Sequence, residues 1–376
     1  MKKISRSIFP SSYADNGPFL VELPRKLMSP EPQPDSTDPD GTSSVPPSIL
    51  RRVLSLPAII SLALAALFLV FIITRFDVDV SGTWDRVTDS NPWLLALAVV
   101  VHYTTFIFRG VRWRLLLQNT AEPGVTVPGV LYCSQLVLLG WFANSVGWLR
   151  LGDAYRAYIY SDEQDGSFSR TIGTILAERT LDTVLVALLL VAAVPFLWDS
   201  GDRVTWLVLG LAVSLVAGLA VILAAMTWAR GLLLRKMPPF LAERYERFHQ
   251  GTIGSFQRVP EATFWGLLAW AAEIGRMYLV VEALGFDISL SLVVFLTLAN
   301  SLLTLVPTPG GVGAVESGVG GLAVRLSSLS ATAAAALVLI DRAITYISVI
   351  VLGAILFVVR QTLWRPRTDG SSAEER

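Results

Sequence analysis

Charged side chains interrupt the hydrophobic segments of this chain, and their types and spacing could do chemistry. Glu178 and Asp182 lie four residues apart in one apolar run, on one face of a helix, with Arg179 between them. Glu273 and Arg276 lie three residues apart in the middle of FWGLLAWAAEIGRMYLVVEALG. Ionisable groups inside a bilayer are costly unless they are paired or face a water-filled cavity, so each marks a candidate functional site.

Two more charged places lie further along the chain: Glu316 in a glycine-rich stretch, and the neighbours Asp341 and Arg342 in the last apolar run. Arginine is the side chain best suited to hold a phosphate with two hydrogen bonds. Arg276 and Arg342, with a broken helix between them, therefore predict a phosphate-binding cavity. The structural alternative is that Arg276 pairs with Glu273 and Arg342 with Glu316, so that buried ion pairs join the helices.

The segment LANSLLTLVPTPGGVGAVESGVGG, residues 298–321, predicts a break in the helix inside the membrane. Proline stops a helix, and glycine permits turns and close approach of the backbone to a ligand. A new helix is expected to begin near Gly313, with amide N–H groups that point into the cavity and attract anions. Glu316 then falls in its first turn, either as a carboxylate favoured by the helix dipole or as a group that takes up a proton during transport. The helix-breaking residues are Pro307, Pro309, Gly310, Gly311 and Gly313.

The second irregular segment, residues 128–148, and the residues just after it carry another set of polar side chains. We expect these side chains to lie near the lipid headgroups. These are Asn144, Arg150, Asp153 and Arg156. The charged and aromatic residues just after the second apolar run are instead typical of interfacial anchors. They are Arg112, Trp113 and Arg114.

The composition is that of a membrane protein: 53% of the 376 residues are hydrophobic and 16% are charged. A soluble domain carries about a quarter charged residues, and several runs here reach the roughly 18 apolar residues that can cross a bilayer. The expected fold class is an all-α, polytopic integral membrane protein of the cell membrane. One cysteine, Cys133, excludes an internal disulfide, and the HExxH, GxxxxGK and GxSxG patterns are absent. We therefore expect no metal, no cofactor, no catalytic residue and no nucleic-acid partner.

Six clear apolar segments and two irregular ones define the expected topology. The clear spans are 57–74, 92–108, 174–198, 204–227, 262–284 and 333–358, and the irregular ones are 128–148 and 289–326. Clusters of Lys and Arg stay cytoplasmic, which places both termini inside. Broken backbone at depth favours re-entrant hairpins, so we expect six full spans plus two re-entrant elements, with eight full spans as the alternative. The organisation is a disordered cytoplasmic tail at 1–50, a transmembrane domain at 51–360 and a short cytoplasmic tail at 361–376.

The two irregular segments contain similar sequences. ANSVGWLRLGDAYRA, residues 143–157, begins like ANSLLTLVPTPGGVGAVES, residues 299–317. Each is preceded by a span and followed by one with an acid–arginine pair; the pairs are Glu178–Arg179 and Asp341–Arg342. In the expected topology the two sets start from opposite sides of the membrane. That is an inverted-topology repeat, which many transporters use to build a midplane site.

Three of these motifs resemble a known family. PTPGGVGAVE, NSVGWLRLGDAYRA and LAERTLD are similar to the flippase-like membrane region of lysylphosphatidylglycerol synthases, and the similarity runs from about Leu54 to Val359. The resemblance implies binding of a lipid with a charged headgroup, such as an aminoacylated phospholipid or a polyprenyl-linked glycolipid, and its movement between leaflets. The soluble aminoacyl-transfer domain of the full synthases has no counterpart in these residues. By motif, the family's positions are Asn144, Arg150, Gly152, Asp153, Arg156, Glu178, Arg179, Asp182, Pro307, Pro309, Gly310, Gly311, Gly313, Glu316 and Arg342.

Three classes of function follow. The first hypothesis is a translocator without covalent chemistry, whose substrate is a membrane lipid. The second is a glycosyl- or aminoacyl-lipid transferase, with Asp153 and Asp182 as base or metal ligand, or an accessory subunit partnered with a lipid-biosynthetic enzyme. The third is a scaffold that recruits partners through residues 1–50. The sequence leaves the lipid, the energy source and the oligomeric state open.

Overall fold

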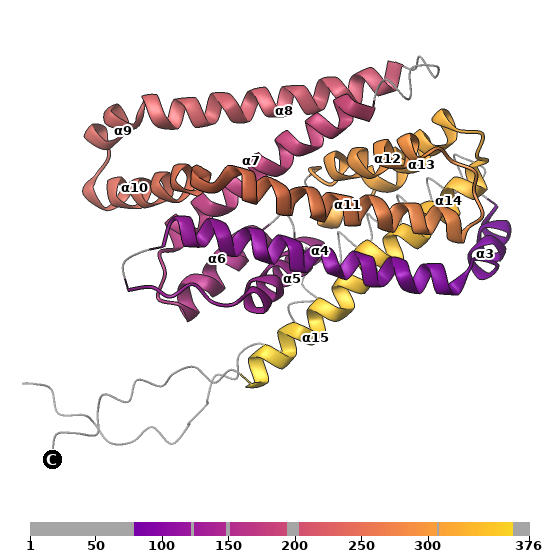
Figure 1. Ribbon diagram of the computed structural model, residues 1–376, viewed down its shortest axis with the longest axis horizontal. Helices are drawn as coiled ribbons and strands as arrows, with labels where there is room; N and C mark the ends of the chain where they lie inside the picture. The colour runs from indigo at the N-terminus through magenta and orange to yellow at the C-terminus, as the bar shows by residue number, and fades with distance from the viewer. Residues whose placement is uncertain (1–78, 122–123, 148–150, 194–202, 307, 364–376) are drawn as a thin grey trace, which may run out of the picture. The chain divides into compact units, whose positions relative to one another are not determined.

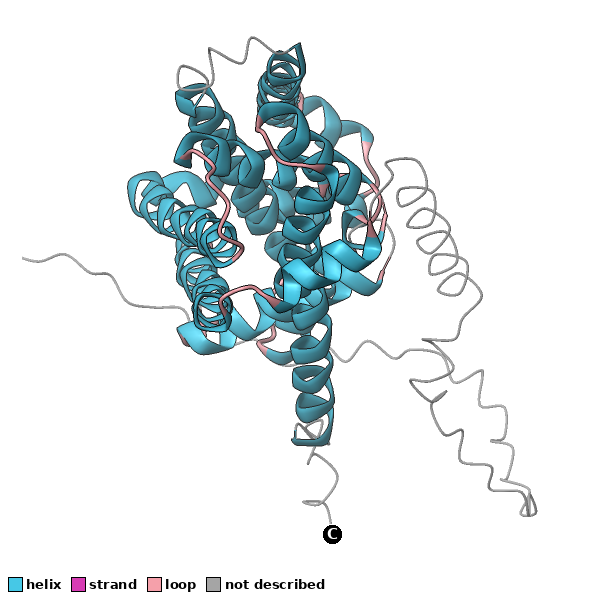
Figure 2. Cartoon of the chain, turned by 90° about the vertical axis from the view of Figure 1, so that its right-hand side faces the viewer, coloured by secondary structure: helices cyan, strands magenta, loops and turns pink. Residues whose placement is uncertain are grey.

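The computed structural model describes residues 79–121, 124–147, 151–193, 203–306 and 308–363 (Figure 1). Within these ranges the elements are helices joined by loops, with no strand (Figure 2). The all-α, polytopic membrane class expected from the sequence is confirmed. The expected tail at 1–50 and the expected span at 57–74 lie outside the described residues, as do residues 364–376.

The described helices follow one another in this order: α3 (Val80–Thr88), α4 (Pro92–Asn119), α5 (Val130–Val146), α6 (Gly152–Glu163), α7 (Phe168–Ala193), α8 (Arg203–Trp228), α9 (Arg230–Lys236), α10 (Pro239–Gly254), α11 (Val259–Ala283), α12 (Leu290–Leu303), α13 (Ala314–Leu326), α14 (Ala331–Arg342) and α15 (Ser348–Leu363). A 3-10 turn, Ser255–Arg258, joins α10 to α11, and a second, Pro309–Gly311, lies between α12 and α13. A π-helical turn, Ala343–Ile347, joins α14 to α15.

Among the described residues, four continuous helical stretches are long and apolar enough to cross a membrane by length and composition. They are Pro92–Asn119, Trp206–Trp228, Pro239–Ala283 and Ala331–Arg360. α5 and α12 are shorter apolar helices of 17 and 14 residues. At 1.5 Å per residue α12 is about 21 Å long, less than the roughly 30 Å of hydrocarbon in a bilayer. Its length fits the expected re-entrant element, and the choice between six and eight full spans stays a prediction.

Side-chain caps start several of these helices. The Asn91 side chain accepts a hydrogen bond from the backbone N–H of Trp93 at 3.0 Å, and Pro92 occupies the first position of α4. Ser289 and Ser330 cap α12 and α14 in the same way. The caps satisfy amide groups that would otherwise lack a partner at the helix ends.

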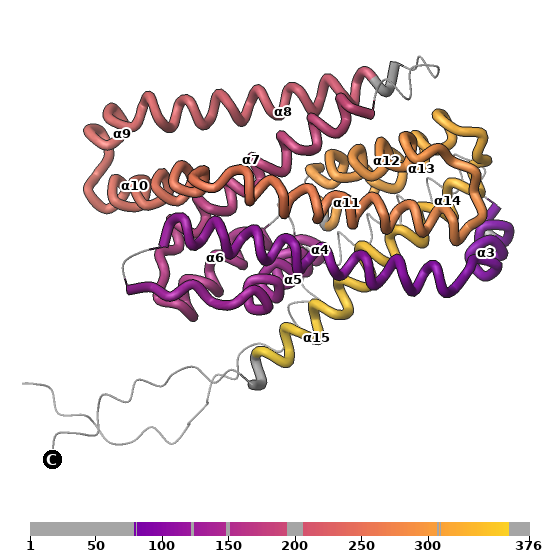
Figure 3. The backbone as a smooth tube through the Cα atoms, in the orientation of Figure 1, coloured from indigo at the N-terminus to yellow at the C-terminus, as the bar shows by residue number. Residues whose placement is uncertain are grey.

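Two helices, α4 and α11, lie side by side over much of their lengths (Figure 1). One apolar cluster joins α11, α12, α13 and α14 with α7, and a second joins α4, α5, α6 and α15. Each cluster therefore contains one of the two short helix pairs, α5–α6 or α12–α13, and Figure 3 traces the chain through both. α8 packs mainly on α7, and many of its apolar side chains, including Leu207 and Val221, are exposed, as in a helix that faces lipid.

The first short helix pair closes at two glycines. A Cβ added at Gly152 would lie 1.9 Å from the carbonyl oxygen of Gly140 and 2.8 Å from Oδ1 of Asn144. Oδ1 of Asn144 accepts the backbone N–H of Gly152 at 2.8 Å. Glycine at position 152 is therefore what lets α6 approach α5 this closely.

Gly152→Ala should destabilise the protein by about 1–3 kcal/mol, because the added methyl group has no room between the two backbones. Unfolding in detergent, followed by circular dichroism, measures the loss. Gly210→Ala on α8 is the matched control, because a Cβ there meets no atom within 4 Å. An unfolding temperature for Gly152→Ala equal to that of wild type would contradict this packing.

Candidate functional site

A cavity of about 200 Å³ lies between the helices of the two apolar clusters. Its walls include α4, α5, α7, α11, α12 and the turn after α14. The charged residues that line it are four arginines and two carboxylates: Arg109, Arg179, Arg276, Arg342, Asp182 and Glu273. Both helix breaks also reach it, through Asn144 and Ser145 on one side and Thr308 and Gly310 on the other.

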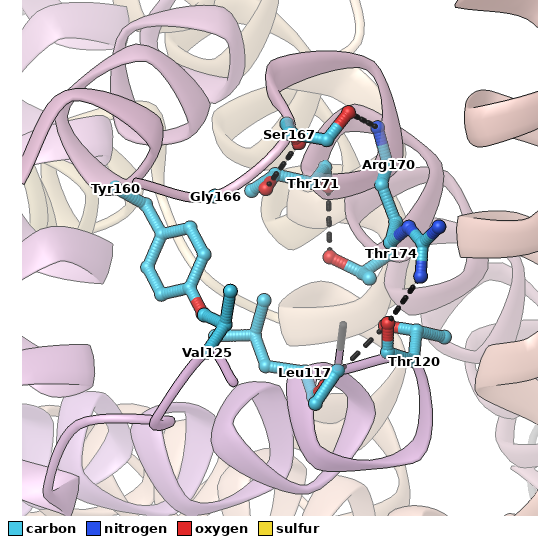
Figure 4. Close-up of a pocket in the computed structure, with 10 residues that line it drawn as sticks. Leu117, Thr120, Val125, Tyr160, Gly166, Ser167, Arg170, Thr171 and Thr174 are labelled. Carbon is cyan, nitrogen blue, oxygen red and sulfur yellow. Dashed lines mark hydrogen bonds between the residues drawn. The ribbon is translucent and has the colours of Figure 1, made fainter. Parts of the chain in front are cut away.

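A second, much smaller cavity lies beside the start of α7 (Figure 4). It has a volume of about 20 Å³ and is lined by residues that include Leu117, Tyr160 and Thr171. Arg170 donates a hydrogen bond from Nη1 to the carbonyl oxygen of Thr120 at 3.0 Å on one side of it. A cavity of this size holds about one water molecule, so the headgroup of a lipid does not fit.

In the N-terminal half, Arg112 is the centre of a buried ion network. It is fully buried, and its two terminal nitrogens donate to Oδ1 and Oδ2 of Asp182 at 2.7 and 2.8 Å. The same guanidinium donates to Oε1 of Glu178 at 3.1 Å, and Arg156 donates to the other oxygen of Glu178 at 2.6 Å. Arg109 completes the network with a 3.3 Å bond to Asp182. The four-residue spacing of Glu178 and Asp182 thus presents both carboxylates to one arginine of α4.

Aromatic rings cover two of these arginines. The Cζ atom of Arg156 lies 4.4 Å from the centroid of the Trp113 ring. Arg109 lies between two indoles, 5.2 Å from Trp141 and 5.5 Å from Trp270. The face of an aromatic ring stabilises a desolvated cation. Arg109 and Arg156 are therefore held both by their carboxylate partners and by these rings.

Arg179, the neighbour of Glu178, turns to a different partner. Its Nε and Nη2 donate to the two carboxylate oxygens of Asp153 at 3.0 and 2.7 Å. Asp153 lies in the first turn of α6, which follows the first helix break. The side chain of Arg179 therefore joins α7 to the start of α6.

The C-terminal half repeats this arrangement. Arg276 of α11 donates to Glu273 at 3.3 Å and also to Asp341 of α14. Arg342 donates from Nε to Glu316 at 2.7 Å and from Nη2 to the carbonyl oxygen of Gly310 at 2.9 Å. Both ion pairs that the sequence suggested, Arg276–Glu273 and Arg342–Glu316, are thus present.

The two halves follow one pattern of pairing. The acid of each acid–arginine pair, Glu178 or Asp341, binds an arginine of the helix before the short helix pair, which is α4 or α11. The arginine of each pair binds a carboxylate in the first turn of the second short helix, which is α6 or α13. The repeat suggested by the shared Ala-Asn-Ser therefore extends to the ion pairs. The inverted orientation of the two halves in the membrane stays a prediction.

The second helix break lies where the glycines predict it. Gly310, Gly311 and Gly313 have φ values of +58°, +70° and +90°, a region that glycine adopts without the strain of a Cβ. α13 begins at Ala314 with Gly313 as its N-cap, and Glu316 lies in its first turn as expected. Pro309 opens the 3-10 turn, whereas Pro307 lies outside the described residues, as does Arg150 from the first break.

The N-cap amide of α13 is bonded within the protein: the backbone N–H of Gly313 donates to Oε2 of Glu316 at 2.6 Å. The protein's own carboxylate fills the position that a ligand anion would take there. Glu316 is therefore bonded through both oxygens, one to Gly313 and the other to Arg342. For the other amide groups of the first turn, the expectation that they face an anion in the cavity stays a prediction.

Side chains just after the second apolar run lie in the protein core. Arg112 and Trp113 were expected to be interfacial anchors beyond residue 108, but α4 continues to Asn119 and both side chains are fully buried. Arg109 is buried as well, on the same helix face three residues earlier. The signal that could have identified them is that Arg109 and Arg112 share one helix face, as Glu178 and Asp182 do on α7.

Within the described ranges, no group of three or more His, Cys, Asp or Glu side chains is arranged to hold a metal ion. The carboxylates around the cavity are bonded to arginines instead. Four predicted site residues do not line the cavity: Asp153, Arg156, Glu178 and Glu316. Two of them bind arginines that do, Asp153 to Arg179 and Glu316 to Arg342.

Comparisons with known proteins agree with the resemblance noted in the motifs. A family described as the lysylphosphatidylglycerol synthase TM region matches residues 58–353. A UPF0104 membrane protein of Methanocaldococcus jannaschii is 27% identical over 61% of this chain and 99% of that protein. A UPF0104 membrane protein of Methanothermobacter thermautotrophicus is 23% identical over 70% of this chain and 84% of that protein. The glycosyltransferase AglD of Haloferax volcanii is 25% identical over 89% of this chain and 59% of that protein. No solved structure matches the chain.

Arg112→Ala should lower the free energy of unfolding by about 3–5 kcal/mol, because two buried carboxylates lose their shared partner. Thermal unfolding in detergent measures the change, with the exposed Arg86→Ala on α3 as the control. Adding Glu178→Gln and Asp182→Asn should lower the stability further, since Arg156 and Arg109 then lose the carboxylates that they still bind. A stability of Arg112→Ala equal to that of the control would contradict the network.

Proposed function

We propose that this chain, which belongs to the lysylphosphatidylglycerol synthase TM region family, binds the charged headgroup of a lipid in its central cavity and moves it across the membrane. The observation that carries the proposal is one cavity lined by arginines from both repeat halves. A phosphate carries oxygen acceptors in a geometry that a guanidinium matches with two hydrogen bonds. Arg179 and Arg342 line the cavity and already hold carboxylates, so a phosphate oxygen can take the place of a carboxylate oxygen there.

The two helix breaks support movement of the lipid as well as binding. Each break contributes side chains or backbone to the cavity, and each is tied to a neighbouring helix by one arginine. In transporters built from repeats, substrate sites lie between the halves at discontinuous helices, and access alternates as one half moves against the other. The arrangement in this chain has the same components, with Arg179–Asp153 and Arg342–Glu316 as the bonds that a rearrangement would break.

A second candidate function is a part in lipid glycosylation, as a transferase or as the membrane subunit of one. The similarity to a protein named glycosyltransferase supports it. The ion pairs favour transport instead, because Asp153 and Asp182, the two aspartates considered as base or metal ligand, are each bonded to arginine. The two functions share a substrate class, a lipid with a phosphate-linked headgroup.

A reconstituted assay tests the proposal. Purified protein in vesicles is given fluorescent phosphatidylglycerol, lysylphosphatidylglycerol, phosphatidylcholine or a polyprenyl phosphate, and a membrane-impermeant quencher reports which leaflet holds the label. Transport of at least one of the charged lipids, faster than in protein-free vesicles, supports translocation. Glycosyl or aminoacyl transfer to the lipid without any movement would favour the second candidate.

Arg342→Gln and Arg179→Gln should each slow this movement about ten- to a hundredfold. The estimate takes about 1.5–3 kcal/mol for a hydrogen bond to a charged group and about 1.4 kcal/mol for each factor of ten. Arg360→Gln is the matched control, since Arg360 also forms an ion pair, the half-buried one to Glu163 at 2.6 Å, but does not line the cavity. If all three variants transport at the same rate as wild type, or slow equally, the cavity arginines do not bind the lipid.

A further inference from the structure

His102 and Glu273 form a buried titratable pair at the wall of the cavity. His102 of α4 is fully buried, and in the described part of the chain neither ring nitrogen has a hydrogen-bond partner. Its Nδ1 lies 3.8 Å from Oε2 of Glu273 on α11, and Oε1 of Glu273 also has no partner there. Buried polar atoms nearly always have a hydrogen-bond partner, so these three atoms without one call for an explanation.

The surroundings of His102 combine apolar rings with a short series of charges. Phe106 packs edge to face against the imidazole, and the ring of Trp141 is tilted toward it. The helix of Trp141, α5, carries no charged residue. Tyr103 packs against the imidazole too, with its hydroxyl bonded to Ser348 near the start of α15. Two charged groups face the pair directly: Arg276 on α11 and Arg109 on α4. Each is bonded to a carboxylate of another helix, Arg276 to Asp341 on α14 and Arg109 to Asp182 on α7.

The buried charges around the cavity are balanced before any lipid binds. Among the described residues, six arginines and six carboxylates form one set of ion pairs. They are Arg109, Arg112, Arg156, Arg179, Arg276 and Arg342 with Asp153, Glu178, Asp182, Glu273, Glu316 and Asp341. With His102 neutral the net charge is zero, so an anionic headgroup adds one uncompensated negative charge. An uncompensated charge is unfavourable away from water, and one added proton neutralises it.

We propose that His102 and Glu273 form a proton-binding site that takes up one proton when an anionic headgroup enters the cavity, so that lipid and proton cross together. The inference deepens the proposed function and rests on it for the lipid. Histidine is suited to the role because it changes charge over about pH 5 to 8. Glu316, the other carboxylate considered for a proton, is bonded through both oxygens and is less suited.

Arg276 links the proton to the lipid. It lines the cavity and divides its hydrogen bonds between Glu273 and Asp341. A protonated imidazole attracts Glu273, and a movement of about 1 Å brings the 3.8 Å separation to the length of a charge-assisted hydrogen bond. The Nε of Arg276 then becomes available to a phosphate oxygen, while Asp341 still holds the other end of the guanidinium.

The test measures lipid and proton movement in the same vesicles. Wild-type protein is reconstituted with fluorescent phosphatidylglycerol and an internal pH dye. We expect lipid movement to become faster as the pH falls from about 8 to about 6, and an imposed pH gradient to drive both lipid and protons. His102→Gln and Glu273→Gln should each lose the pH dependence and the proton flux. His249→Gln is the matched control, because His249 is the other histidine of the chain and lies on α10, away from the cavity.

The outcomes separate this inference from the proposed function. Lipid movement by wild type that is independent of pH and carries no protons overturns the proton site and leaves lipid transport standing. A readout without lipid is the nitrogen-15 NMR signal of the histidine side chains in detergent. An imidazole signal that titrates over about pH 5 to 8 in wild type and His249→Gln, but is missing from His102→Gln, supports the site even if no lipid moves. A His102 signal that does not titrate in this range in wild type overturns the site, and Glu273→Gln, which should move the titration to lower pH because it removes the facing carboxylate, decides the matter if His102→Gln fails to fold.

Discussion

The structure depends on pairing every buried charge near the cavity with an opposite one. In hydrocarbon, apolar contact alone gives helices little reason to associate, because lipid tails are as apolar as leucine. The ion pairs make the association specific, since all of them except Arg276–Glu273 cross from one helix to another: α4 to α7, α6 to α7, α11 to α14 and α13 to α14. A buried ion pair adds little net stability over apolar packing. Its effect here is to select which helices meet and at which height.

The same solution is used twice in one chain. Each half has a central helix, a short broken pair and a helix with an acid–arginine dipeptide, and each dipeptide bonds in two directions. Because the arginines of both halves line one cavity, a ligand bound there would contact both repeats at once. Through such a ligand, a change in the ion pairs of one half would reach the other half.

The sequence predicts local features well and distant partners poorly. The glycines between α12 and α13, the helix start at Gly313 and the pair Arg276–Glu273 all follow from residues close together in the chain. Arg112 was missed because its partners, Glu178 and Asp182, are more than sixty residues away and no local pattern marks the contact. The continuation of α4 to Asn119 was not predicted because the apolar run ends at residue 108. Arginines that follow an apolar run are typical of the end of a membrane span, and only their distant partners identify them as buried.

The position of Arg109 between Trp141 and Trp270 has a practical consequence. Both indoles line the cavity, one from α5 and the other from α11. Indole emission responds to the charge and polarity next to the ring, so two of the eleven tryptophans would sense any molecule that displaces water beside that guanidinium. The protein thus carries an intrinsic optical reporter at the seam between its halves, which needs no attached dye.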